Sequence, residues 1–238
     1  MIPISDDVPS RTVPLVTIGL IGANVAVFLY QASLGISADP RAASIAQAFV
    51  MEFGAIPCRL SGGCPAVDGF PHPVVTIFTA MFLHGGLFHV GGNMLYLWIF
   101  GNNVEDTLGH GRFLLFYLAS GIAAAFAQTF VNPDSTVPMI GASGAVSGVL
   151  GAYLVLFPYA RVLVLLIFGF FIRPVYVPAI VVLGFWIVVQ FVNGLITVSA
   201  AAHGGGEAGG TAWFAHIGGF LAGIVLLFLI RRWRGGRL

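Results

Sequence analysis

Residues 141–156 read Gly-Ala-Ser-Gly-Ala-Val-Ser-Gly-Val-Leu-Gly-Ala-Tyr-Leu-Val-Leu, a stretch without any charged side chain. Within it, Ser143, Ser147 and Gly151 follow one another at intervals of four and therefore share one face of a helix. Small residues at this spacing let two helix backbones approach closely inside a membrane. The stretch predicts an apolar helix that packs tightly on a neighbouring helix and carries a serine at its start.

The whole chain has the composition of a membrane protein. Of its 238 residues, 58% are hydrophobic and 8% are charged, whereas about 25% of residues are charged in soluble domains. Apolar runs near or above the roughly 18 residues needed to cross a bilayer recur along the sequence. We expect an all-α polytopic fold, a bundle of six transmembrane helices at residues 14–34, 85–104, 113–131, 143–157, 177–197 and 211–230.

The arginines predict the topology of these six spans. Eight of the ten arginines fall on the side of the two chain ends, and only Arg41 and Arg59 fall on the other side. Cytoplasmic segments are the arginine-rich ones, so we expect a multi-pass protein of the cell membrane with both termini in the cytoplasm. A short segment, 1–13, and a basic tail, 232–238, would flank a six-helix domain at 14–231. Without a basic tract, nucleic acid is not an expected partner.

Three connections between the spans have distinctive compositions. The long outward segment 35–84 is expected to fold against the membrane surface, and the glycines of 198–210 favour a mobile lid. The apolar stretch 162–172, inside the link 158–176, is too short to span the bilayer. We expect this link to lie at the membrane interface or to be partly re-entrant.

The two cysteines, Cys58 and Cys64, lie in the first outward segment. In an oxidising compartment they would close a small disulfide ring. The alternative is a zinc site shared with His72, although no fourth ligand is evident. The sequence leaves both possibilities open. For the chemistry of the active site we expect no metal and no other cofactor.

Polar side chains inside apolar spans are costly and usually functional. His89 and Asn93 lie four residues apart in the expected second span and share one face of it, and His84 lies near its outer end. Ser143 begins the fourth span, and His216 lies early in the sixth. In the expected topology all five residues are in the outward half of the membrane.

Packing brings Ser143 and His216 together in this arrangement. Next to His216, Ala215, Gly219 and Gly223 repeat the four-residue interval of small residues seen in the fourth span. A hydroxyl in contact with an imidazole is a nucleophile with its general base. Since the expected span cores contain no acidic residue, the sequence predicts a Ser/His dyad rather than a Ser/His/Asp triad.

Acyl transfer also needs hydrogen-bond donors for the tetrahedral oxyanion. Because Ser143 starts a helix, the backbone N–H groups of Ser143 and Gly144 have no intrahelical acceptor. His89 and Asn93 would add side-chain donors from the facing helix. Two prolines keep the segment before Ser143 from being helical, which places this serine below the membrane surface in a water-filled cavity.

Four motifs contain these residues: Leu83-His84-Gly85-Gly86, the run from His89 to Glu105, Gly141-Ala142-Ser143-Gly144, and the run from Ala215 to Gly223. Over roughly residues 14–225 the chain resembles the rhomboid family of intramembrane serine proteases. The resemblance implies a six-helix protease fold with Ser143 as nucleophile and His216 as general base and then acid. It further implies oxyanion donors at His89 and Asn93, a supporting role for His84, and single-pass membrane proteins as substrates within the lipid bilayer.

One position departs from the family pattern. Some members carry a Tyr one turn after the nucleophile, packed on the catalytic His, whereas this chain has Ser147 there. Ser147 would either contribute a hydrogen bond or act as a small packing residue. What orients His216 is left open by the sequence.

Two other functions compete with proteolysis. A rhomboid-like protein that only binds transmembrane helices would not need both Ser143 and His216. A small transporter is suggested by polar residues in or near spans, Gln190 and Asn193 among them. A transporter needs a polar path across the whole bilayer, however, and the polar residues singled out above gather in its outward half. A zinc protease is disfavoured because the chain lacks a His-Glu-x-x-His pair.

Overall fold

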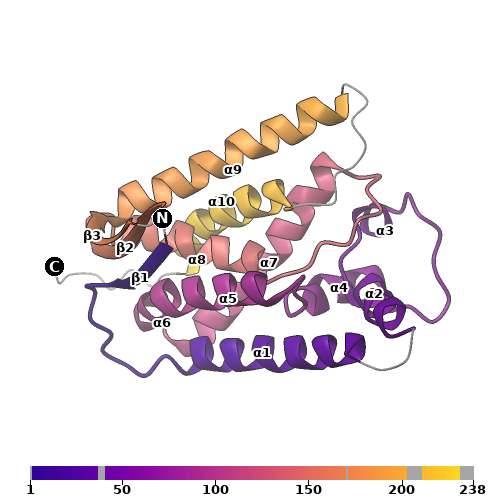
Figure 1. Cartoon of the computed structure of the whole chain (residues 1–238), viewed down its shortest axis with the longest axis horizontal. Coiled ribbons are helices and arrows are strands. Elements are labelled where there is room, and N and C mark those ends of the chain that lie inside the picture. Colours follow the sequence, from indigo (N-terminus) through magenta and orange to yellow (C-terminus); the bar gives the residue numbers. More distant parts are fainter. Residues whose placement is uncertain (1, 37–40, 170, 203–210, 231–238) are drawn as a thin grey trace.

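The computed structural model describes residues 2–36, 41–169, 171–202 and 211–230. Long helices run side by side, with three strands at one end of the bundle and short helices at the other (Figure 1). In chain order the elements are β1 (Ile2–Asp6), α1 (Leu15–Gly35), α2 (Ala42–Phe53), α3 (Pro57–Ser61), α4 (Pro73–Ala80), α5 (Leu87–Tyr96), η1 (Leu97–Gly101), α6 (Asn102–Leu108), α7 (His110–Val131), α8 (Ser143–Leu156), β2 (Arg161–Phe168), β3 (Phe171–Pro178), α9 (Ala179–Ala202) and α10 (Trp213–Ile230).

Four of the described helices, α1, α7, α9 and α10, are long and apolar enough to cross a membrane. The other two expected spans also contain helices but differ in form. α5, η1 and α6 are one continuous helical run whose middle turn is a π-helix, and α8 has only 14 residues. The chain is therefore a mostly helical, multi-pass membrane protein, and the count of six spans stays a prediction.

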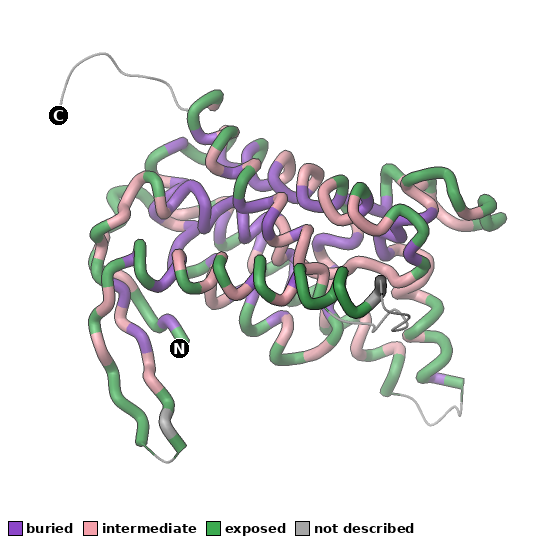
Figure 2. Tube along the Cα trace, turned by 90° about the horizontal axis from the view of Figure 1, so that it is seen from above, coloured by how far each residue is buried: buried purple, intermediate pink, exposed green. Residues whose placement is uncertain are grey.

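α8 lies at the centre of the bundle, between α10 and the α5 run (Figure 1). Its residues from 145 to 153 are all buried, and buried residues gather along the middle of the helices in Figure 2. A helix enclosed by protein on every side needs no polar face. This explains why its sequence is apolar and small-residue-rich all round.

α8 and α10 pack backbone against backbone. A Cβ atom added at Gly219 would lie 2.1 Å from the carbonyl oxygen of Gly144, and one at Gly223 would lie 2.2 Å from the carbonyl oxygen of Gly148. Both distances are far below van der Waals contact, so only glycine fits at these two positions. The predicted small-residue interface is confirmed, with the closest contacts on the glycines beside the two serines.

The expectation of an all-α protein is wrong at one end of the bundle. β2 and β3 form an antiparallel hairpin that takes up most of the link 158–176 and ends at Pro178, and β1 pairs with β2 to complete a three-stranded sheet. The hairpin projects sideways from the helices (Figure 2), with Val162 and Val164 buried at its base and Ile172 and Tyr176 exposed. A short, continuous apolar run does not distinguish strand from helix by periodicity, which is why the sequence did not reveal the strands.

Segment 35–84 contains α2, α3 and α4. Within it Cys58 and Cys64 form a disulfide. The zinc alternative is thereby ruled out, because both thiols are used. Of the proposed lid, residues 198–202 continue α9, whereas 203–210 lie outside the described residues, as does the basic tail 232–238.

The contact between α8 and α10 predicts a steric test. Gly223→Ala places a methyl group against the Gly148 carbonyl and should destabilise the protein by about 1–3 kcal/mol, the usual cost of overpacking. The measurement is thermal unfolding of the purified protein in detergent. Gly22→Ala on α1 is the matched control, since a Cβ there meets no atom within 4 Å. Equal melting temperatures for the two variants would contradict the close packing described above.

Candidate active site

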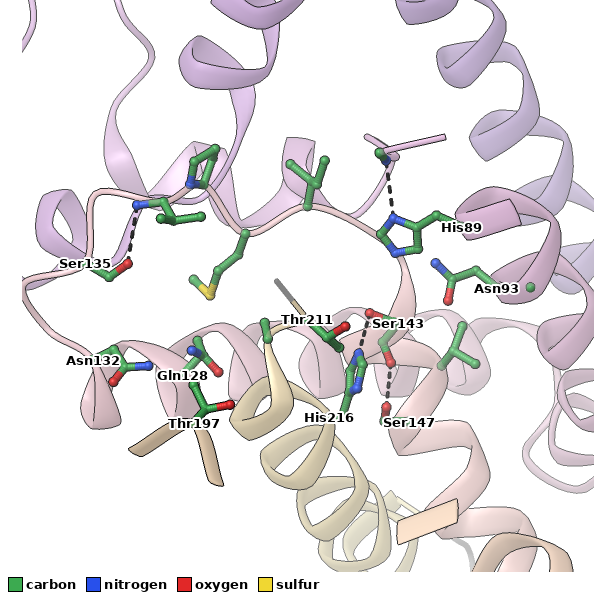
Figure 3. A pocket seen from close by; sticks show the side chains of 18 of the residues that line it. His89, Asn93, Gln128, Asn132, Ser135, Ser143, Ser147, Thr197, Thr211 and His216 are labelled. Carbon is green, nitrogen blue, oxygen red and sulfur yellow. Dashed lines mark hydrogen bonds between the residues drawn. The ribbon is translucent and has the colours of Figure 1, made fainter. Parts of the chain in front are cut away.

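Ser143 and His216 meet, as the sequence predicted. The Ser143 Oγ lies 2.8 Å from the His216 Nε2 (Figure 3). Ser143 is the first residue of α8, and His216 lies in the first turn of α10. The close approach of these two helices therefore brings hydroxyl and imidazole to hydrogen-bond distance although they are 73 residues apart in the chain.

Backbone hydrogen bonds to Ala55 and Ala80 hold the segment before Ser143 in an extended form. Met139 pairs with Ala55 through two backbone hydrogen bonds of 2.8 and 3.1 Å, and the Gly141 N–H donates to the Ala80 carbonyl at 2.8 Å. Gly141 has a φ of +118°, which side chains with a Cβ rarely adopt. The sharp turn made possible by this glycine directs the chain into α8 with Ser143 at its start.

His89 and Asn93 line the same cavity as Ser143 and end beside Gly141. A Cβ at Gly141 would lie 2.7 Å from the His89 Nε2 and 3.5 Å from the Asn93 Nδ2. The His89 Nδ1 accepts a hydrogen bond from the Gly85 N–H, so its Nε2 carries the proton in the neutral ring. The Asn93 Nδ2 is buried and has no hydrogen-bond partner among the described residues. Both side chains thus present donors next to Ser143 (Figure 3).

Backbone donors lie on the other side of the serine. The hydrogen bonds of α8 begin with the Val146 N–H, which donates to the Ala142 carbonyl at 2.9 Å. The three preceding N–H groups, those of Ser143, Gly144 and Ala145, belong to the first turn and have no acceptor within the helix. A Cβ at Gly144 would lie 2.6 Å from that of Ala124, so glycine here also lets α8 pack on α7.

A cavity of about 1060 Å³ surrounds Ser143 and His216. Polar side chains line its wall away from the serine, among them Gln128, Asn132 and Ser135 (Figure 3). A cavity of this size, with polar side chains in part of its wall, has room for water and for an extended peptide segment.

Two of the predicted residues do not contact the reacting atoms, the Ser143 Oγ and the His216 Nε2. The Ser147 hydroxyl donates to the Ser143 carbonyl at 2.6 Å and so braces the first turn of α8. His84 is fully buried, and its ring lies edge-on to that of His89, with 5.1 Å between centroids. The Gln31 side chain bonds both the N–H and the carbonyl of His84. Their contacts are those of supporting residues.

The sequence did not reveal what holds the His216 ring. The Gln190 Oε1 lies 2.8 Å from the His216 Nδ1, and the rings of Trp186 and Trp213 lie 5.8 and 6.4 Å from the imidazole. In the sequence Gln190 is one of several polar residues in or near spans, and the available signal, its spacing from Trp186, does not say which helix the two residues face. Trp186 and Gln190 are four apart and so share one face of α9.

Gln128 was also missed. Its side-chain oxygen, which comes from α7, accepts the backbone N–H groups of Phe214 and Ala215 at 3.1 and 3.2 Å. It therefore caps the start of α10 directly before His216. The signal available in the sequence is that Gln128 is a single polar side chain near the end of an apolar span, where polar groups usually have a partner.

Comparisons with known proteins identify a family for the chain. Residues 71–233 match the family model described as the Rhomboid domain, a stretch that contains every candidate residue. The chain is 46% identical over 78 residues to the Rhomboid protease GluP of Bacillus subtilis, which is 33% of this chain and 15% of that protein. It is 32% identical over 158 residues to the mitochondrial Rhomboid protein 1 of Saccharomyces cerevisiae, 63% of this chain and 40% of the relative.

A third relative is the RHOMBOID-like protein 1 of Arabidopsis thaliana, 33% identical over 162 residues, 67% of this chain and 36% of that protein. The chain thus spans less than half the length of each of these relatives. Its match to the family model covers more than half of its own length. On that ground, with the motifs gathered around one cavity, the chain belongs to the rhomboid family.

Proposed function

We propose that the chain is an intramembrane serine endopeptidase that hydrolyses peptide bonds in or near the transmembrane helices of single-pass membrane proteins. The observation that carries this proposal is the 2.8 Å contact between the Ser143 Oγ and the His216 Nε2 in a polar cavity among apolar helices. A relative named as a rhomboid protease supports the reaction class. A mere binder of transmembrane helices has no use for this contact.

The first half of the reaction forms an acyl-enzyme. The Ser143 Oγ attacks the scissile carbonyl carbon while the His216 Nε2 takes the hydroxyl proton, which requires an unprotonated Nε2. The Gln190 acceptor at Nδ1 favours that state of the ring. When the tetrahedral intermediate collapses, the imidazolium gives its proton to the leaving amine, and the carbonyl carbon remains bonded to the Ser143 Oγ.

The oxyanion that forms in this step needs donors that are already in place. The Asn93 Nδ2 and the His89 Nε2–H lie next to Gly141, two residues before the nucleophile. The backbone N–H groups of Ser143 and Gly144 lie at the positive end of α8. We assign these four groups to the oxyanion site. The unpaired state of the Asn93 donor among the described residues supports the assignment.

The second half of the reaction returns the free enzyme. A water molecule from the cavity attacks the acyl carbonyl, and the His216 Nε2 now takes a proton from this water. The second tetrahedral intermediate uses the same donors and expels the Ser143 Oγ, which regains its proton from the imidazolium. The polar lining of the cavity supports this step, because it admits water into an apolar bundle.

The proposed orientation places the site toward the outward face, with both termini in the cytoplasm and the six helices as spans. The sheet end of the bundle carries Arg161 and Arg173, and the disulfide between Cys58 and Cys64 lies at the opposite end with α3 (Figure 1). Disulfides persist in oxidising compartments, and arginines collect on the cytoplasmic side. The two signals support the same orientation.

Orientation is tested with reporter fusions. Fusions after Arg112, after Arg173 and at the C-terminus should all report the cytoplasm, and a fusion next to Cys64 should report the opposite side. An outward C-terminus would overturn the six-span arrangement.

The nucleophile is tested with a purified protein and a transmembrane substrate in liposomes. Ser143→Ala and His216→Ala should each abolish cleavage, and the double variant should be no worse, because the two residues act as one unit. Ser147→Ala is the matched control and should keep measurable activity, since its hydroxyl bonds a backbone carbonyl rather than His216. Cleavage by Ser143→Ala would disprove the assignment.

The oxyanion site is tested at Asn93. Asn93→Ala should lower kcat by roughly 100-fold or more, as removal of an oxyanion donor does in soluble serine proteases. KM should change little, because the donor acts on a charge that exists only in the transition state. Asn132→Ala removes an amide from a more distant part of the same cavity and should have a much smaller effect. Equal losses in the two variants would count against the assignment.

A further inference from the structure

The His216 ring is held at both of its nitrogens by different helices. Its Nε2 faces the Ser143 Oγ of α8, and its Nδ1 faces the Gln190 Oε1 of α9, each at 2.8 Å. Both ring nitrogens are thus used, and neither partner is a carboxylate. Gln190 itself is only 5% exposed, so water does not compete strongly for its amide.

A second hydrogen bond fixes which end of the Gln190 amide faces the histidine. The Gln190 Nε2 donates to the Trp186 carbonyl, one turn earlier in α9, at 3.2 Å. If the amide were reversed, its oxygen would face that carbonyl oxygen, and two acceptors would be opposed. Since the amide oxygen faces His216, the Nδ1 must carry the ring proton. The Nε2 is then left with a lone pair, directed at the hydroxyl of Ser143.

We propose that Gln190 is a positioning residue that holds His216 in the tautomer needed to accept the Ser143 proton. This inference rests on the proposed function. In a Ser/His/Asp triad a carboxylate fixes the tautomer of the histidine. A neutral amide does the same without a charge buried at membrane depth, where an ionised side chain is expensive. Unlike a carboxylate, it does not neutralise the imidazolium, so its effect on rate is smaller than that of a triad aspartate.

The same helix supplies the ring that packs on His216. Trp186 lies at 5.8 Å between ring centroids, inclined by 37°, and Phe220 packs on the far part of this cluster at 6.1 Å from Trp186. Trp186 thus occupies a face of the imidazole, and Gln190 binds its Nδ1. Some family members orient the catalytic histidine with a Tyr of the fourth span, at the position of Ser147 in this chain. Here Trp186 and Gln190 of α9 provide the orienting contacts instead.

The proposal is tested by comparing two substitutions at one site with a control one turn away. Gln190→Leu removes the acceptor at similar volume, and Gln190→Glu keeps an acceptor. Asn193→Leu is the control, because the Asn193 amide donates to the Val189 carbonyl of its own helix. For a transmembrane substrate, Gln190→Leu should lower kcat by roughly 10- to 100-fold, part of the usual contribution of general base catalysis. KM should stay within about twofold, and Gln190→Glu, which keeps an acceptor for Nδ1 but places an oxygen against the Trp186 carbonyl, should recover part of the rate.

A spectroscopic measurement distinguishes a role of Gln190 in setting the His216 tautomer from a role in packing α9 against the other helices. In ¹⁵N NMR of histidine-labelled protein, the His216 signals, identified by their loss in His216→Ala, should show the Nδ1–H tautomer in the wild type and in Asn193→Leu. Gln190→Leu should shift the population toward the Nε2–H form. An unchanged tautomer in Gln190→Leu, or an equal loss of kcat in Asn193→Leu, would overturn the proposal.

The two experiments also separate this inference from the proposed function. If the wild type cleaves no transmembrane substrate and Ser143 is inert, the proposed protease activity fails. The tautomer measurement needs no turnover, so it still decides whether Gln190 controls the state of the His216 ring.

Discussion

The backbones of α8 and α10 approach so closely that a Cβ at Gly219 would lie 2.1 Å from the Gly144 carbonyl oxygen and one at Gly223 would lie 2.2 Å from the Gly148 carbonyl oxygen. In lipid, apolar side chains gain little by moving from one apolar surface to another, so helices associate through close packing and polar contacts. A side chain at any of these positions would push the helices apart. The distance between Ser143 and His216 would grow with that separation. The hydrogen bond between these two residues therefore depends on the glycines that let α8 and α10 pack closely.

Besides the glycines, neutral polar side chains hold Ser143 and His216 in place. Gln128 caps the start of α10, Gln190 binds the imidazole that this turn carries, and Ser147 braces the first turn of α8. Each hydrogen bond joins groups that would be costly to leave unpaired at membrane depth. Because none of these side chains is charged, holding the site together carries no desolvation cost for a buried ion.

The sequence predicted the contact between Ser143 and His216 better than it predicted the surrounding fold, for identifiable reasons. Ser143 and His216 lie beside small residues that repeat every four positions. In apolar helices this pattern indicates close packing of two helices, so it predicts that the two residues meet. The run 162–168 is continuously apolar, so its strand character was hidden, and the spacing of Cys58 and Cys64 suited a disulfide as well as a metal. Gln190 could not be placed, because the pattern that pairs α8 with α10 says nothing about which face of α9 meets them.

The central claim is that Ser143 is a nucleophile activated by His216, and covalent labelling tests it most directly. Purified protein in liposomes is treated with a fluorophosphonate, and the adduct is mapped by mass spectrometry of its peptides. We predict one adduct, on Ser143, and a strongly reduced labelling rate in His216→Ala although the serine is still present. An adduct on another serine, or labelling of Ser143 at the same rate without His216, would contradict this account of the site.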